Sequence, residues 1–227
     1  MKILTIFLLL FSLFSNALEL GTHKYALIVN DFTVGEDIRK LVKNKQQYIY
    51  TSNVKTVGLV ALFKNYTITA KSRFILNKLG VNGQSYNVLE KDGDTIKKDI
   101  SLMIKTKQQK VIAKNKQVWQ TKKGNVVDFL NIPLALAYDL ETKPKQNSFT
   151  YQIADGKKIK TKYFIKKTTE IITIGNVKYN SIKVIEKPRG NNRLLKVWFA
   201  IDKNYLPIRI LQHEPNDDIY EYVLINE

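Results

Sequence analysis

The chain has 227 residues, no cysteine, two histidines and a formal charge of +17 at pH 7. With 44% hydrophobic residues it can bury a core, which excludes a disordered or low-complexity chain. The absence of cysteine excludes a disulfide framework, a thiol nucleophile, a cysteine-ligated metal site and a lipid-modified N-terminal cysteine. The composition therefore indicates a folded protein whose function does not depend on cysteine.

The amino terminus has the pattern of a cleaved export signal. Lys2 precedes an apolar run over residues 3–14, and the small residues Ser15 and Ala17 occupy the −3 and −1 positions of a cleavage site. A membrane span needs about 20 apolar residues, and this run is shorter. We therefore expect residues 1–17 to be a signal peptide, residues 18–227 to form a single β-rich domain, and the mature protein to be a periplasmic monomer.

The N-terminal half of the mature chain alternates apolar and polar residues between short turns, which is typical of half-buried strands. Asp92-Gly93 predicts a tight hairpin turn, because glycine adopts positive φ without strain. A bulge or bend is expected at Gly58. The predicted strands are Tyr25–Val34, Tyr48–Leu62, Tyr66–Leu76, Thr95–Thr106 and Lys110–Gln120.

The segment Val126–Leu140 is apolar almost all round and lacks alternation. This pattern predicts a buried helix, or two helices bent at Pro133, with Asp128 or Asn131 as the N-cap. Leaving three of its large side chains in water would cost roughly 5–9 kcal/mol, at about 1.5–3 kcal/mol each. We therefore expect the concave face of a sheet to cover this helix.

The C-terminal half returns to alternation with short turns. Short connections favour an antiparallel meander, since parallel strands need long crossovers. The predicted fold is mainly β: a large curved antiparallel sheet or open β-barrel with one buried hydrophobic helix. The predicted strands here are Phe149–Ala154, Lys158–Lys166, Glu170–Ile174, Lys178–Glu186, Leu194–Ile201, Pro207–Gln212 and Ile219–Ile225.

The positive charge has two interpretations. Only five of the 37 basic residues are arginine, so one interpretation is a lysine-rich composition, with lysines on the wet faces of strands. The other is attraction to anionic headgroups, that is, peripheral contact with an anionic membrane surface. A nucleic-acid binder would cluster arginine and aromatic residues on one element, so we expect no nucleic-acid partner.

Residues for catalysis or metal binding are sparse. His23 and His213 are far apart in sequence, and no Gly-x-Ser-x-Gly motif is present, so we interpret both histidines as surface residues. The acidic residues fall mostly in turns, and no spacing singles out a carboxylate pair for glycan hydrolysis. We expect no enzyme activity, metal or cofactor, and a carboxylate-dependent hydrolase is the minority alternative.

The most specific local pattern is Val197–Ile210, in which Trp198 is followed by Asp202 and then by Pro207-Ile-Arg209-Ile. It resembles the strand–turn–strand signature of a family of bacterial exported proteins called domain of unknown function 3108. Residues 24–35 resemble the opening strand and glycine of that family. Asp128-Phe-Leu-Asn131 resembles the entry to its central helix, with Asn131 where serine is commoner.

The resemblance implies an exported, β-rich protein, similar in outline to the half-barrels with an inserted helix of periplasmic lipoprotein carriers, and it implies no reaction. We hypothesise that the protein binds or carries a hydrophobic or amphiphilic envelope component, a lipid or lipoprotein, between sheet and helix. An envelope scaffold that binds protein or peptidoglycan, with that interface filled, is the alternative. Trp198 either packs under the sheet or lines a ligand cavity. The candidate ligand-binding residues are Phe129, Leu130, Leu134, Tyr138, Trp198 and Arg209.

Overall fold

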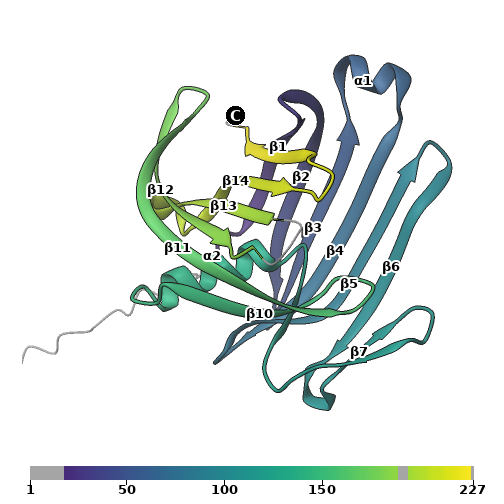
Figure 1. Ribbon diagram of the computed structural model, residues 1–227, viewed down its shortest axis with the longest axis vertical. Coiled ribbons are helices and arrows are strands. Elements are labelled where there is room, and N and C mark those ends of the chain that lie inside the picture. The colour runs from purple at the N-terminus through teal and green to yellow at the C-terminus, as the bar shows by residue number, and fades with distance from the viewer. Residues whose placement is uncertain (1–17, 189–193, 226–227) are drawn as a thin grey trace, which may run out of the picture.

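The computed structural model describes residues 18–188 and 194–225, so the predicted signal peptide, residues 1–17, lies outside the described residues. The described strands form a fifteen-stranded sheet with the order β8-β7-β6-β5-β4-β3-β2-β1-β15-β14-β13-β12-β11-β10-β9. Neighbouring strands in this order pair antiparallel, including β1 with β15, except for β9 and β10, which are parallel; β8 and β9 are the edge strands. The sheet curves strongly without closing, which confirms the predicted fold class (Figure 1).

The N-terminal half builds one side of this sheet. Its elements are β1 (Gly21–Val29), β2 (Phe32–Asn44), β3 (Gln47–Thr56), α1 (Gly58–Phe63), β4 (Tyr66–Asn77), β5 (Gly80–Asp92), β6 (Thr95–Lys105), the short 3-10 helix η1 (Thr106–Gln108), β7 (Lys110–Ala113) and β8 (Val118–Gln120). The sequence interpretation missed most of β2 and all of β5, and it joined β7 to β8. It was also wrong to extend the strand through Gly58, because α1 begins there.

The C-terminal half builds the other side. Its elements are β9 (Val126–Asp128), α2 (Ile132–Thr142), β10 (Ser148–Ala154), β11 (Ile159–Ile174), β12 (Val177–Glu186), β13 (Leu194–Ala200), η2 (Ile201–Lys203), β14 (Leu206–His213) and β15 (Ile219–Leu224). The strands predicted at 158–166 and 170–174 are one strand, β11, whose register shifts between Lys166 and Thr169. A bulge therefore replaces the expected break.

The helix predicted at 126–140 is shorter and begins later. Val126 and Val127 pair with β10, as suits β-branched residues, and the helix begins after Asn131 with Pro133 in its first turn. Asn131 stands at the N-cap position, but its side chain makes no capping hydrogen bond there. The apolar run therefore contains a strand, a turn and a helix.

The main core lies between α2 and both halves of the sheet. Leu41, Tyr48 and Phe74 from β2–β4 and Val197 and Phe199 from β13 join α2 in one buried cluster. Figure 1 shows α2 on the concave side, with the long strands β2–β6 curving past it. The concave face thus covers the apolar helix, as expected from its sequence.

Candidate functional site

The predicted ligand-binding residues around α2 are packed into the core. Leu134 is 5% exposed and belongs to the main buried cluster, against which the half-buried Phe129, Leu130 and Tyr138 pack. Ile132 and Leu136 are fully buried beside them. The structure therefore brings these four predicted residues together, and side chains of the chain itself fill the space around α2.

A buried polar cluster fixes the entry to α2. Ser72 Oγ and Asn131 Nδ2 donate to Asp128 Oδ2 at 2.7 and 2.9 Å, and the backbone N–H groups of Leu130 and Asn131 donate to Asp128 Oδ1 at 3.0 Å. Burial raises the pKa of Asp128 to about 7, although these hydrogen bonds oppose the increase. Because Ser72 belongs to β4, Asp128 ties the turn before α2 to the opposite half of the sheet.

Trp198 and Arg209 lie on the other face of the sheet. Their neighbours Val197, Phe199 and Ile210 belong to the cluster around α2, and successive side chains of a strand point to opposite faces. The indole Nε1 of Trp198 donates to Glu170 Oε1 at 2.8 Å, and Arg209 Cζ lies 4.9 Å from the Trp198 ring centroid. The structure does not bring Trp198 and Arg209 to the residues of α2.

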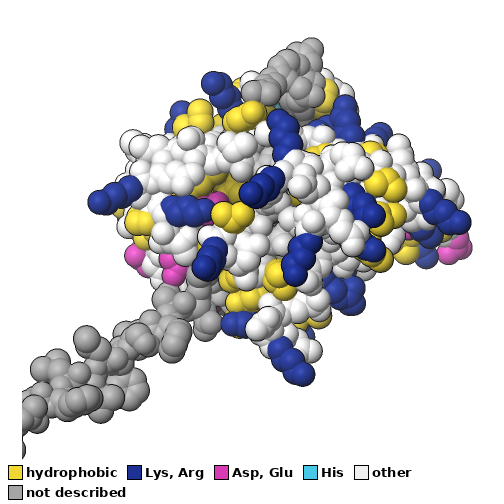
Figure 2. Space-filling model, turned by 90° about the horizontal axis from the view of Figure 1, so that it is seen from below, with side chains coloured by type: hydrophobic (Ala, Val, Ile, Leu, Met, Phe, Trp, Pro, Cys, Tyr) yellow, Lys and Arg dark blue, Asp and Glu magenta, His cyan; other side chains and the backbone are white. Residues whose placement is uncertain are grey.

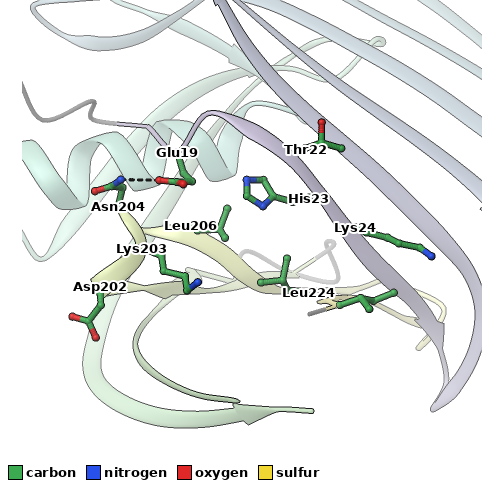
Figure 3. A pocket seen from close by; sticks show the side chains of 10 residues that line it. Glu19, Thr22, His23, Lys24, Asp202, Lys203, Asn204, Leu206 and Leu224 are labelled. Carbon is green, nitrogen blue, oxygen red and sulfur yellow. Dashed lines mark hydrogen bonds between the residues drawn. The ribbon is translucent and has the colours of Figure 1, made fainter. Parts of the chain in front are cut away.

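An open pocket of about 410 Å³ lies beside the start of β1, among the side chains that Figure 3 labels. His23 is half-buried there, and burial lowers its pKa. His23 is therefore only partly the surface residue expected from the sequence. Glu19 accepts a hydrogen bond from Asn204 at 2.7 Å across the same pocket. The lining mixes both charges and favours neither a cationic nor an anionic ligand.

A second open pocket, of about 430 Å³, lies where the turn between β10 and β11 approaches β6 and β7. Gly156 lines it beside Ile100 and Ala113. Neither pocket is lined by residues of α2.

The most distinctive surface is an exposed apolar cluster at one end of the sheet, which we call the apolar end. Leu59, Leu62 and Phe63 of α1 are 79, 75 and 90% exposed, and no residue of α1 is buried. Phe32 in the β1–β2 hairpin and Ile96 in the β5–β6 hairpin are also exposed. Figure 1 shows α1 at the tip of β3 and β4.

Hydrogen bonds hold these hairpins together, so the apolar end has a fixed shape. Val57 N–H donates to the Val34 carbonyl at 3.1 Å, and Gly93 N–H donates to the Asn65 carbonyl at 2.8 Å. The hydroxyl of Thr56 donates to the Lys64 carbonyl at 2.6 Å and closes the loop that contains α1. An ordered backbone thus presents large apolar side chains to solvent.

Sequence interpretation missed this surface by extending a strand through it. Residues 57–63 read Val-Gly-Leu-Val-Ala-Leu-Phe, which lacks alternation. A half-buried strand needs alternation, so this absence could have identified an element of another kind.

The described part of the chain lacks two features that would bear on function. No group of three or more histidine, aspartate or glutamate side chains is arranged to hold a metal ion among those residues. No described helix is both long and apolar enough to span a membrane.

Comparisons with known proteins identify a family and a fold. The family model described as protein of unknown function (DUF3108) matches residues 24–224. No curated protein matches the chain. The crystal structure of a beta-barrel-like protein of domain of unknown function DUF1849 from Brucella abortus superposes with a TM-score of 0.59 and 8% identity, over 92% of this chain and 97% of that chain. At this identity the likeness establishes a shared fold.

Proposed function

This chain belongs to the DUF3108 family of proteins of unknown function, and we propose that it is an exported, periplasmic, non-enzymatic protein that binds a hydrophobic or amphiphilic component of the cell envelope. The component would be a lipid or the acyl part of a lipoprotein. The observation that carries this proposal is the apolar end, where an ordered loop exposes Leu59, Leu62 and Phe63. Contiguous exposed apolar side chains on a folded domain mark interaction sites.

The location of the proposed surface follows from accessibility. The side chains of α2 are packed against the sheet, and a ligand there would have to displace α2 residues that are at most 5% exposed, such as Ile132 and Leu136. The side chains of α1 require no such displacement. We therefore place amphiphile binding at α1.

The energy available at this surface suits a reversible complex. Covering the three large side chains of α1 would contribute roughly 5–9 kcal/mol, at about 1.5–3 kcal/mol each. Association itself costs several kcal/mol in lost translational and rotational freedom. The balance corresponds to weak binding, which suits a carrier that must release its ligand.

Titration with monomeric lysophosphatidylcholine, followed by calorimetry and native mass spectrometry, tests the proposal. The zwitterionic headgroup of this probe limits the contribution of net protein charge. The wild-type protein should bind it, and a variant carrying Leu59→Ser, Leu62→Ser and Phe63→Ser should bind at least tenfold more weakly. The matched control removes three exposed apolar side chains elsewhere, through Ile38→Ser, Met103→Ser and Ile171→Ser, and should bind like wild type.

Two outcomes would overturn the proposal. One is the absence of lysophosphatidylcholine binding by the wild-type protein. The other is equal binding by the α1 variant, which would place any lipid site elsewhere. If lipid fails to bind but purified envelope proteins are retained through α1, the scaffold alternative gains support.

A further inference from the structure

The end of the sheet opposite to α1 is rich in lysine, and the acidic residues Glu19, Asp139 and Asp202 also lie toward it. Five connecting segments lie there: residues 43–47, 77–80, 105–109, 121–125 and 142–147, which we call the cationic end. They contain nine lysines in 25 residues and no aspartate or glutamate. Figure 2, which looks onto the molecule from below, shows many more dark blue than magenta side chains.

The antiparallel meander brings these segments together. Connections β2–β3, β4–β5 and β6–β7 must share one end of the sheet, because each strand reverses the direction of the preceding one. Asn125 Nδ2 donates to Asn77 Oδ1 at 2.9 Å, and Thr121 N–H donates to the Gln109 carbonyl at 2.8 Å. A Cβ atom at Gly80 would lie 3.4 Å from a carboxylate oxygen of Asp139, near the end of α2.

Most of these lysines have no anionic partner within the described part of the chain. Of the nine, Lys143 forms an ion pair, with Asp139 at 2.7 Å, and Lys43 lies over the Tyr48 ring. Lys45, Lys78, Lys107, Lys122, Lys123 and Lys145 are exposed. Leu79, in the β4–β5 turn, is 63% exposed among them. This end therefore offers a cationic surface with an apolar side chain within it.

The connections at the apolar end have the opposite balance. Residues 30–32, 57–65, 92–96 and 214–218 contain six acidic residues and one lysine in 22 residues. Asn30 Nδ2 donates to Asp218 Oδ1 at 3.3 Å, which joins two of these segments. A lysine-rich composition alone would supply lysine to both ends. The connecting turns at the two ends therefore differ in charge, and exposed Lys97 and Lys98 on β6 lie just beyond the acidic turn of residues 92–96.

We propose that the cationic end docks on the surface of a bilayer that contains anionic phospholipid. Clustered lysines outside a membrane are attracted to anionic headgroups, with an interaction that decays within a Debye length. Exposed Leu79 would enter the headgroup layer between them, as apolar side chains do in peripheral proteins. In this orientation the apolar end, at the opposite end of the strands, faces away from the bilayer. The inference is independent of the lipid-binding role of α1.

Co-sedimentation with phosphatidylcholine vesicles, with and without phosphatidylglycerol, tests the proposal. The wild-type protein should bind the anionic vesicles, and increasing salt should release it. The variant Lys45→Gln, Lys78→Gln, Lys107→Gln, Lys122→Gln, Lys123→Gln should bind at least tenfold more weakly. The control Lys55→Gln, Lys97→Gln, Lys98→Gln, Lys167→Gln, Lys178→Gln removes the same charge from exposed sites outside the cationic end and should bind like wild type.

Three outcomes would overturn the proposal. Equal binding to vesicles without phosphatidylglycerol would show that charge does not direct the contact. Equal loss in the two lysine variants would show that net charge, rather than this surface, is responsible. Complete competition by soluble polyphosphate at low concentration would identify a free phosphate polymer as the ligand. Circular dichroism of each variant establishes that it remains folded.

Discussion

The two ends of the sheet differ in the chemistry that they present. The apolar end carries α1, with Leu59, Leu62 and Phe63 largely exposed, among connections that are mainly acidic. The cationic end carries nine lysines and no acidic residue in its five connecting segments. The same long strands hold both ends, because successive hairpins of a meander lie alternately at opposite ends of the strands. One framework can thus keep two unlike surfaces apart.

Buried polar groups differ from the side chains of both ends, because their partners lie inside the molecule. Asp128, Ser72 and Asn131 form a polar cluster inside the molecule, and their hydrogen-bonding groups are directed at one another. Arg39 is similarly engaged by Asp37 at 2.7 Å and lies over the rings of Tyr25 and Tyr222. These buried polar groups hold the sheet together, whereas the two ends face outward.

The largest expected loss of stability comes from a substitution in the core between the two ends. Leu136→Ala removes a fully buried side chain between α2 and the sheet and should lower the free energy of unfolding by about 2–5 kcal/mol. Denaturant unfolding measures this change. A loss below about 1 kcal/mol would indicate a loosely filled interface, which would return the ligand site to α2 and weaken the assignment to α1.

The next largest effect is a pH dependence of the free energy of unfolding, which arises at Asp128 in the turn before α2. This turn follows the lysines of segment 121–125. The carboxyl group of Asp128 has an ordinary pKa of 3.8 and a pKa of about 7 in the folded protein. Between these values the folded protein holds a proton that the unfolded chain has released. The free energy of unfolding should therefore fall as pH rises through this range, by at most about 1.4 kcal/mol per pH unit, and level off above about pH 7.

Unfolding of the wild type and of Asp128→Asn at pH 5 and pH 8 checks this pH dependence. The wild type should lose more stability than the variant between the two pH values. Equal losses would mean that Asp128 stays ionised in the folded protein, held so by its four hydrogen-bond donors.

The smallest effect concerns a surface that belongs to neither end. Arg209→Gln removes the cation over the Trp198 ring and the ion pair with Glu221. It should lower the free energy of unfolding by about 1 kcal/mol and change Trp198 fluorescence. Binding of lysophosphatidylcholine and of anionic vesicles should be unchanged. A parallel loss of lysophosphatidylcholine binding would restore the sequence interpretation of Trp198 and Arg209 as ligand residues.

Alternation of apolar and polar residues predicted the strands that show it clearly. Prediction failed for segments that lack alternation. The strands of residues 66–77, 95–105 and 177–186 lie close to their predicted ranges, because alternation and a flanking turn define each of them. Val126 and Val127 were placed in a helix, because an apolar run has no period that separates a buried strand from a buried helix. Pairing with β10 decided that point.

The amino-acid sequence by itself determined the mainly β fold class, the antiparallel order and a helix that must be covered, since these depend on short-range periodicity and connection length. Tertiary structure alone decided which distant residues meet. Lys45, Lys78 and Lys123 share one end because strand lengths and register bring their turns there, and Trp198 is directed away from Leu134 because the pleat alternates. Register depends on pairing between segments far apart in the chain.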